Sequence, residues 1–222
     1  MTGTQDQVSM FTLVLSSAVV SAAVNVGWNA VSKAIDYFKE KSKDDQKVGH
    51  VYLGIATQLE AFARHCSARI YDINEGLSLY RGQHNDNAFE GFGPVLLQFS
   101  PEPDWTALPV HFAADVQALP SRFQQSDLWI RSQFQYWAEI DDAYEFEQER
   151  LAYYALKACD VAARIRLKIK APDSELIDLT ERFHTFIAQR RAVYQENPAT
   201  HNFLPELQAQ FERDQSRPSR AR

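Results

Sequence analysis

The feature that most constrains this chain is a long run without charge close to its start. No Asp, Glu, Lys or Arg occurs from Gln7 to Ser32. A helix needs about 20 predominantly apolar residues to cross the hydrocarbon core of a bilayer. We therefore expect a single transmembrane helix over residues 10–32, preceded by a short external tail at residues 1–9.

The distribution of basic residues predicts how this helix is oriented. No Lys or Arg precedes it, and the residues that follow it include Lys33, Lys39, Lys41, Lys43 and Lys47. Basic residues flanking a membrane helix stay predominantly on the cytoplasmic side. We therefore expect attachment to the inner (cytoplasmic) membrane as a single-pass protein. Its N-terminus lies outside, and a charged juxtamembrane segment at 33–47 leads into a cytoplasmic body.

Small polar residues gather on one side of the predicted membrane helix. The residues concerned are Ser17, Ser21, Asn25 and Asn29. Positions four apart share a helix face. In a bilayer, small residues let helix backbones approach, and Ser or Asn side chains hydrogen-bond across the contact. This face predicts self-association or the binding of a partner helix, although Ala and Ser are also ordinary in weakly apolar membrane helices.

The same polar residues make insertion marginal, so two other interpretations stay open. A secretory signal peptide would end near the small residues Ser21, Ala22 and Ala23. However, signal peptides start with positive charge, and this chain has only Asp6 in that region. The other interpretation is a helix buried in a soluble core or in a partner.

The remainder of the chain has the composition of a globular helical body. Apolar residues make up 45% and charged residues 23%, values ordinary for a folded domain. Apolar residues recur every three or four positions from Gln46 to Leu77, from Pro120 to Pro172 with a restart near Asp141, and from Ser174 to Asn197. We predict an all-α bundle of three to four long helices over residues 48–197 and a C-terminal tail at 198–222.

Charge and cysteine content exclude several functions. The net charge of −6 argues against nucleic-acid binding, which needs clustered basic residues to displace counterions from phosphates. Cys66 and Cys159 lie within apolar helical patterns and lack the spacing of a zinc site, so we expect buried, reduced thiols. The chain has no nucleophile elbow and no glycine-rich phosphate loop, so we expect no cofactor and no catalytic residue.

A different composition separates the first two helices of the body. Residues 78–119 are rich in Gly and Pro and also in aromatics, which include Phe89, Phe92, Phe99 and Trp105. Disordered segments are poor in aromatics, so we expect an ordered cover with a short extended piece at Val95–Phe99. These four aromatic side chains form a partner surface if they are exposed and a satellite core if they are packed.

One cluster of acidic residues carries the alternative function. Asp142, Glu145 and Glu149 share a helix face with Asp141 close by, and such carboxylates can hold Mg²⁺ and through it a phosphate. This would make the chain a metal-dependent hydrolase of small phosphorylated substrates. However, no second acidic helix is evident, and negative charge is favoured at any helix start.

The motifs Tyr52–Ala56, Leu59-Glu60, Phe62-Ala63, Cys66, Asp72, Asp104-Trp105 and Glu147–Ala163 resemble those of a loose group of uncharacterised bacterial proteins. These proteins have one N-terminal membrane segment and a helical cytoplasmic body, and no activity is known for them. The resemblance implies the same architecture and supplies no site. Our leading hypothesis is therefore a membrane-anchored helical interaction or scaffold protein, binding protein partners or itself.

Overall fold

The computed structural model describes residues 46–83, 86–136, 139–196 and 202–216. Contacts divide the chain into two units, Met1–Gly49 and His50–Arg222, and the fold below is that of the second. The predicted membrane helix at 10–32 lies outside the described residues. So do the external tail and the association face of Ser17, Ser21, Asn25 and Asn29. None of the described helices is both long and apolar enough to span a membrane.

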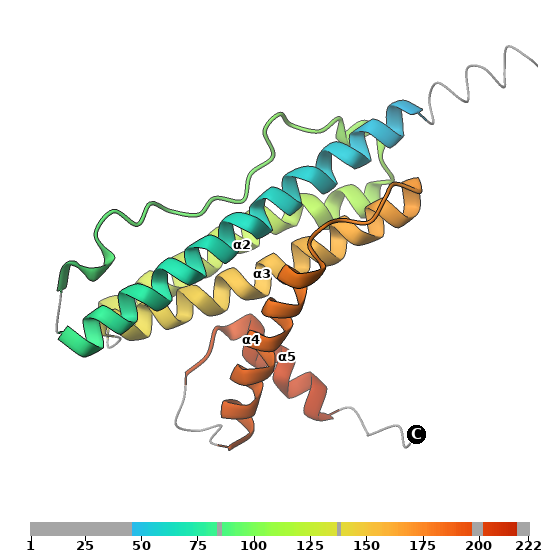
Figure 1. Ribbon diagram of the computed structural model, residues 1–222. Coiled ribbons are helices and arrows are strands. Elements are labelled where there is room, and N and C mark those ends of the chain that lie inside the picture. Colours follow the sequence, from blue (N-terminus) through green and yellow to red (C-terminus); the bar gives the residue numbers. More distant parts are fainter. Residues whose placement is uncertain (1–45, 84–85, 137–138, 197–201, 217–222) are drawn as a thin grey trace, which may run out of the picture. The chain divides into compact units, whose positions relative to one another are not determined.

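The described part of the chain is helical, which confirms the all-α prediction (Figure 1). The first helix spans residues 46–83. The others are α2 (Val110–Tyr136), α3 (Ile140–Ile169), α4 (Ile177–Glu196) and α5 (Pro205–Ser216), with two short 3-10 helices, η1 (Asp86–Phe89) and η2 (Trp105–Ala107). No strand occurs among these residues, so the body is a bundle of four long helices and one short helix.

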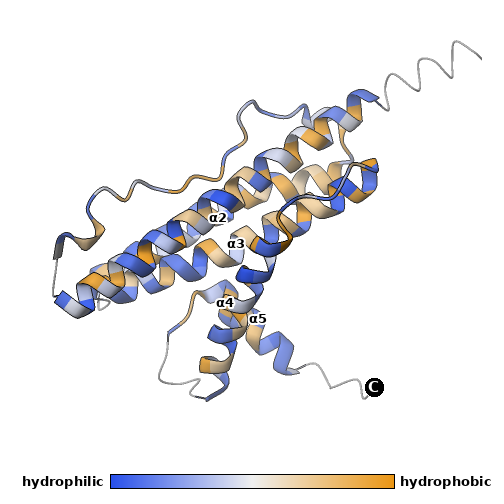
Figure 2. Ribbon diagram, viewed as in Figure 1, coloured by the Kyte–Doolittle hydropathy of each residue, from blue (hydrophilic) through white to orange (hydrophobic). Residues whose placement is uncertain are grey.

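The core forms where the apolar faces of these helices meet. The first helix buries Ile55, Leu59, Cys66 and Ile73 completely, which confirms the face predicted from their spacing. Helix α3 contacts both α2 and α4, and it therefore buries residues on more than one side. Figure 2 shows hydrophobic and hydrophilic residues interleaved along each long helix, as expected of amphipathic helices packed in a bundle.

Helix α2 begins at Val110, ten residues before the start predicted at Pro120. Proline is common at the first position of a helix, but here it lies inside one, where it removes a backbone hydrogen bond. Packing compensates for the lost hydrogen bond. The ring centres of Phe112 and Tyr52 lie 5.1 Å apart, and Val116 is buried. Residues 110–119, which precede the proline, are thus the first part of α2.

Helix α3 has sequence signals at both ends. Glu139 and Asp142 form a capping box at its start, which places the predicted restart near Asp141 at a helix boundary. At its end Lys170 adopts a left-handed conformation with φ 54°, and its N–H bonds back to the last turn. The stretch at 163–171, in which apolar and basic residues alternate, is helical as far as Ile169.

An extended segment at residues 90–104, here called the strap, runs beside the first helix (Figure 1). At one end the ring of Phe89 lies against Gly76, and at the other the Ser100 N–H donates to Gln58 Oε1 at 2.6 Å. Gly76 and Gln58 are 18 residues apart on a helix, which is about 27 Å. The chain covers this span between Phe89 and Ser100 at about 2.5 Å per residue, which is more than the rise of a helix and less than that of a fully extended chain.

We expect Gly76→Ala to destabilise the protein by about 1–3 kcal/mol, because it overpacks this contact. A Cβ at Gly76 would lie 2.8 Å from two ring carbons of Phe89, and that ring is stacked on Tyr144 at 3.8 Å. Gly54 on the same helix has nothing within 4 Å of its Cβ position, so Gly54→Ala should be neutral or stabilising. Urea unfolding of both variants tests this, and equal stabilities would contradict it.

The C-terminal region, predicted as a tail at 198–222, contains a helix that packs on the body. Residues 205–216 form α5, and Leu207 and Phe211 are buried, as are Phe203 and Leu204 before them. The ring of Phe211 packs on Tyr194 of α4 at 5.5 Å. A short polar helix such as this is marginal alone and depends on tertiary packing, which the local sequence does not reveal.

Candidate functional site

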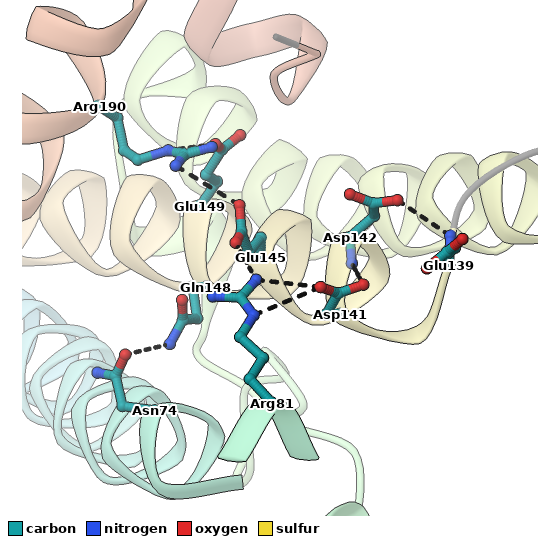
Figure 3. Close-up of polar contacts among 9 residues, drawn as sticks. All are labelled: Asn74, Arg81, Glu139, Asp141, Asp142, Glu145, Gln148, Glu149 and Arg190. Atoms are coloured by element: carbon teal, nitrogen blue, oxygen red, sulfur yellow. Dashed lines mark hydrogen bonds and ion pairs between the residues drawn. The ribbon is translucent and has the colours of Figure 1, made fainter. Parts of the chain in front are cut away.

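The four carboxylates of the predicted metal site lie on α3 but are bound by different partners (Figure 3). Arg81, from the end of the first helix, donates from Nη2 to Asp141 Oδ2 at 3.2 Å and to Glu145 Oε1 at 2.5 Å. Hydrogen bonding to Glu145 raises the pKa of Arg81. These two carboxylates are therefore paired with one arginine, which lies 60 or more residues away in sequence.

Asp142 and Glu149 have separate structural roles. Asp142 Oδ2 accepts the backbone N–H of Glu139 at 3.0 Å and so caps α3. Glu149 is completely buried, and its carboxylate accepts from Arg190 Nε at 2.6 Å and from the Leu204 N–H at 2.8 Å. Burial raises the pKa of Glu149 to about 7, although Arg190 and the Leu204 amide favour its charged form.

The arrangement gives the metal hypothesis no support. Among the described residues, no group of three or more His, Cys, Asp or Glu side chains is placed to hold a metal ion. The acidic face of α3 instead joins the first helix through Arg81 and α4 through Arg190. The metal-dependent hydrolase stays an untested prediction, and we do not propose it.

The four aromatic side chains predicted to form either a partner surface or a satellite core are packed within the chain. Phe89 stacks on Tyr144, Phe92 lies 4.8 Å below the Arg69 guanidinium, and Phe99 meets Trp105 edge-on at 5.3 Å. All four predicted partner-surface aromatics therefore have packing partners within the chain. This favours the satellite-core interpretation.

Both cysteines are free and buried, and burial raises the pKa of each thiol. At neutral pH they are therefore protonated, and the nucleophilic thiolate form is scarce. This confirms the prediction of buried, reduced thiols.

A groove between the first helix and α4 was not predicted. It consists of one pocket of about 560 Å³ and another of about 300 Å³, which share Asn74 and Phe186. From the first helix it is lined by Ser67, Tyr71, Asn74, Ser78 and Arg81. From α4 it is lined by Asp178, Arg182, Phe186 and Arg190. Both sets recur every three or four residues, so one face of each helix borders the groove along its length.

The floor and rim of the groove differ in polarity. Phe183 is buried and Ile70 and Phe186 are half-buried, whereas Tyr71 on the rim is 69% exposed. At the narrower end Gln148 Nε2 donates to Asn74 Oδ1 at 2.8 Å, beside the Arg81 and Arg190 pairs (Figure 3). The groove thus has an apolar centre, a charged end and an exposed aromatic side chain.

The sequence contains a weak signal for this groove. On the first helix, Tyr71 and Asn74 form a second stripe beside the buried face, and Tyr71 is a large exposed aromatic on that stripe. The signal becomes recognisable only when the stripe on α4 is known to lie opposite. No protein-family model, curated protein or solved structure matches this chain.

Proposed function

We propose that this chain is a membrane-anchored interaction protein whose helical body binds one helix of a partner protein in the groove between the first helix and α4. The observation that carries the proposal is the groove itself, bordered by a stripe of side chains from each helix. Grooves of this kind receive the apolar face of an amphipathic helix, whose anchors recur at the same three- and four-residue steps.

The dimensions of the groove support a helical partner. Ser67 and Arg81 are 14 residues apart, which on a helix is about 21 Å, or roughly four turns. The half-buried rings and aliphatic side chains of the floor would contact the apolar face of the partner. Asp178 and Glu181, at the wider end, are exposed and have no ion pair with another described residue. They favour a partner helix with a basic residue at that end.

A site-specific photocrosslinking experiment tests the groove. A photoreactive phenylalanine analogue at Tyr71 should give a discrete crosslinked adduct in cells, because this side chain lies on the rim. The same analogue at Tyr136, which is 79% exposed at the end of α2 and does not line the groove, should give none. Phe186→Arg should abolish the adduct at position 71. Equal adducts at both positions, or an adduct unaffected by Phe186→Arg, would contradict the proposal.

The anchor is proposed from the sequence, because the uncharged run from Gln7 to Ser32 is long enough to span a bilayer. We expect the intact chain to stay with the membrane pellet after alkaline carbonate washing. A reporter at its N-terminus should lie outside, and the body should lie in the cytoplasm. Release of the intact chain into the supernatant would remove the anchor from the proposal and leave the groove untouched.

A further inference from the structure

Three helices of the body come together at the end where the chain enters it. The body begins at His50, and the ring centre of Tyr52 lies 5.1 Å from that of Phe112 in the first turn of α2. Lys168, in the last turn of α3, donates from Nζ to the Tyr52 hydroxyl at 2.6 Å. The start of the first helix, the start of α2 and the end of α3 therefore meet at one end of the body, here called the entry end (Figure 1).

Two aliphatic side chains at the entry end are the most exposed large apolar side chains among the described residues. Val110, at the start of α2, is 85% exposed, and Leu167, next to Lys168, is 81% exposed. Single exposed apolar side chains are ordinary on a protein surface. Two of them beside exposed lysines are typical of surfaces that rest at a lipid interface, where the apolar groups enter the headgroup boundary and the lysine ammonium groups stay in water.

The charged residues of the helices at the entry end are basic. Lys168 and Lys170 are both exposed there, and no Asp or Glu occurs in residues 50–59, 105–114 or 161–172. The acidic residue that follows, Asp173, comes after the chain has turned back along α3, because the Pro172 carbonyl accepts from Arg166 Nη1 at 3.0 Å. The entry end therefore presents positive charge and apolar groups together.

The other end of α3 and the chain as a whole carry the opposite charge. Glu139, Asp141 and Asp142 lie at the start of α3. Residues 1–49 hold five basic and five acidic residues, so the net charge of −6 belongs to the body. The cytoplasmic leaflet of a membrane is anionic and attracts basic groups close to its surface. Such a surface repels the body as a whole and attracts its entry end, so charge orients the body with that end toward the bilayer.

We propose that the entry end of the body rests on the anionic membrane surface, with Val110 and Leu167 at the lipid interface and Lys168 and Lys170 beside lipid headgroups. This inference rests on the proposed membrane anchor and is independent of the groove. Two lysines alone attract an anionic surface only weakly. The anchor compensates, because only 17 residues separate Ser32 from the start of the body, and such a tether raises the effective concentration of a weak contact.

Fluorescence quenching by spin-labelled lipids tests this contact. The full chain with Leu167→Cys is labelled with an environment-sensitive fluorophore and reconstituted in vesicles of phosphatidylcholine and phosphatidylserine; the native Cys66 and Cys159 are buried. Lipids with a nitroxide at the headgroup should quench this label several-fold more strongly than the same label at Tyr136→Cys. Tyr136 is the matched control, because it is 79% exposed but lies at the far end of α2 from Val110, about 39 Å along the helix.

Removing the two lysine charges tests the role of the anionic lipid. Lys168→Gln with Lys170→Asn should reduce the quenching at position 167 several-fold. Both substitutions suit their positions, since Gln can still donate to the Tyr52 hydroxyl and Asn tolerates the left-handed backbone at residue 170. Arg64→Gln with Arg122→Gln removes the same charge at exposed positions farther along the first helix and α2, and should leave the quenching unchanged. Vesicles of phosphatidylcholine alone should reduce it as the lysine variant does.

The possible results separate this contact from the anchor. If the chain stays in the carbonate pellet and the labels at positions 167 and 136 are quenched equally, the contact is overturned and the anchor stands. Quenching at position 167 that is unchanged in phosphatidylcholine alone would also overturn it. A blue-shifted label at position 167 that the nitroxide lipids do not quench would show that protein, and not lipid, covers the entry end. Release of the chain from the pellet would remove the anchor and this inference together.

Discussion

Arg190→Met should lower the free energy of unfolding by about 3–5 kcal/mol at pH 8, and by about 1 kcal/mol less at pH 5.5. Arg190 is the charged partner of Glu149, which is completely buried, and its own side chain is only 19% exposed. Removing one member of a buried ion pair leaves the other charge without compensation, and this accounts for the size of the effect.

The pH dependence follows from the raised pKa of Glu149. Its folded-state value of about 7 exceeds the ordinary 4.5, so the folded protein binds the proton more tightly than the unfolded chain does. The stabilisation from this group is complete below pH 4.5 and is lost as the pH rises through about 7. Without Arg190 the pKa of Glu149 rises further, so the variant should lose stability more steeply between pH 5.5 and 8. Urea titrations of the wild type and of the variant across this range measure how steeply the free energy of unfolding of each falls with pH.

Two controls make this prediction specific. Glu149→Gln with Arg190→Met removes both charges and keeps an acceptor for the Leu204 N–H, so most of the loss at pH 8 should be recovered. Arg191→Met removes the neighbouring arginine, whose pair with Asp214 is more than one-third exposed on both sides. It should cost less than about 1 kcal/mol. A loss for Arg190→Met that is equal at pH 5.5 and pH 8 would refute the assignment of the effect to Glu149.

Arg150→Met should cause a loss of similar size, about 3–5 kcal/mol. Arg150 is 3% exposed and donates two hydrogen bonds of 2.7 Å to Glu147 and one of 3.0 Å to the Phe123 carbonyl. Its guanidinium also lies 3.9 Å from the Phe123 ring centroid. Burial raises the pKa of Glu147, and Arg150 opposes that rise. The variant therefore leaves the half-buried Glu147 carboxylate without this donor, whereas the Phe123 carbonyl still accepts from the Ser126 hydroxyl.

Arg131→Met is the matched control for this second prediction. Both arginines approach Asp127, Arg131 at 2.9 Å and Arg150 at 3.7 Å, but the Arg131 side chain is 72% exposed. Surface ion pairs contribute little because water screens them, so this variant should lose less than about 1 kcal/mol. Comparable unfolding midpoints for the two variants, measured by circular dichroism in urea, would show that Arg150 is not the stabilising contact.

The sequence predicts the helices well where a long apolar periodicity dominates. The buried face of the first helix and the capping of α3 by Glu139 and Asp142 follow from local patterns. The start of α2 does not follow from a local pattern. Proline favours a helix start in general, and only the contact of Phe112 with Tyr52 explains why the helix begins earlier.

The candidate site could not be predicted because its partners are distant in sequence. The acidic face of α3 is visible as a cluster, but its meaning depends on Arg81, 60 residues from Asp141, and on Arg190, 41 residues from Glu149. A row of carboxylates is compatible with a metal site, a solvated surface or a set of ion pairs. Tertiary packing determines which of these three arrangements forms. It also brings the stripes of the first helix and α4 to opposite sides of a groove.

The hydrogen bond from the Leu204 N–H to Glu149 has a practical consequence for anyone who prepares fragments of this protein. The composition of the chain invites truncation near residue 197, where the last long helix ends. Such a fragment would lack the only backbone donor that Glu149 has among the described residues, and would uncover the apolar surface now beneath Phe203 and Phe211. An expression fragment of the body should therefore extend at least to Ser216.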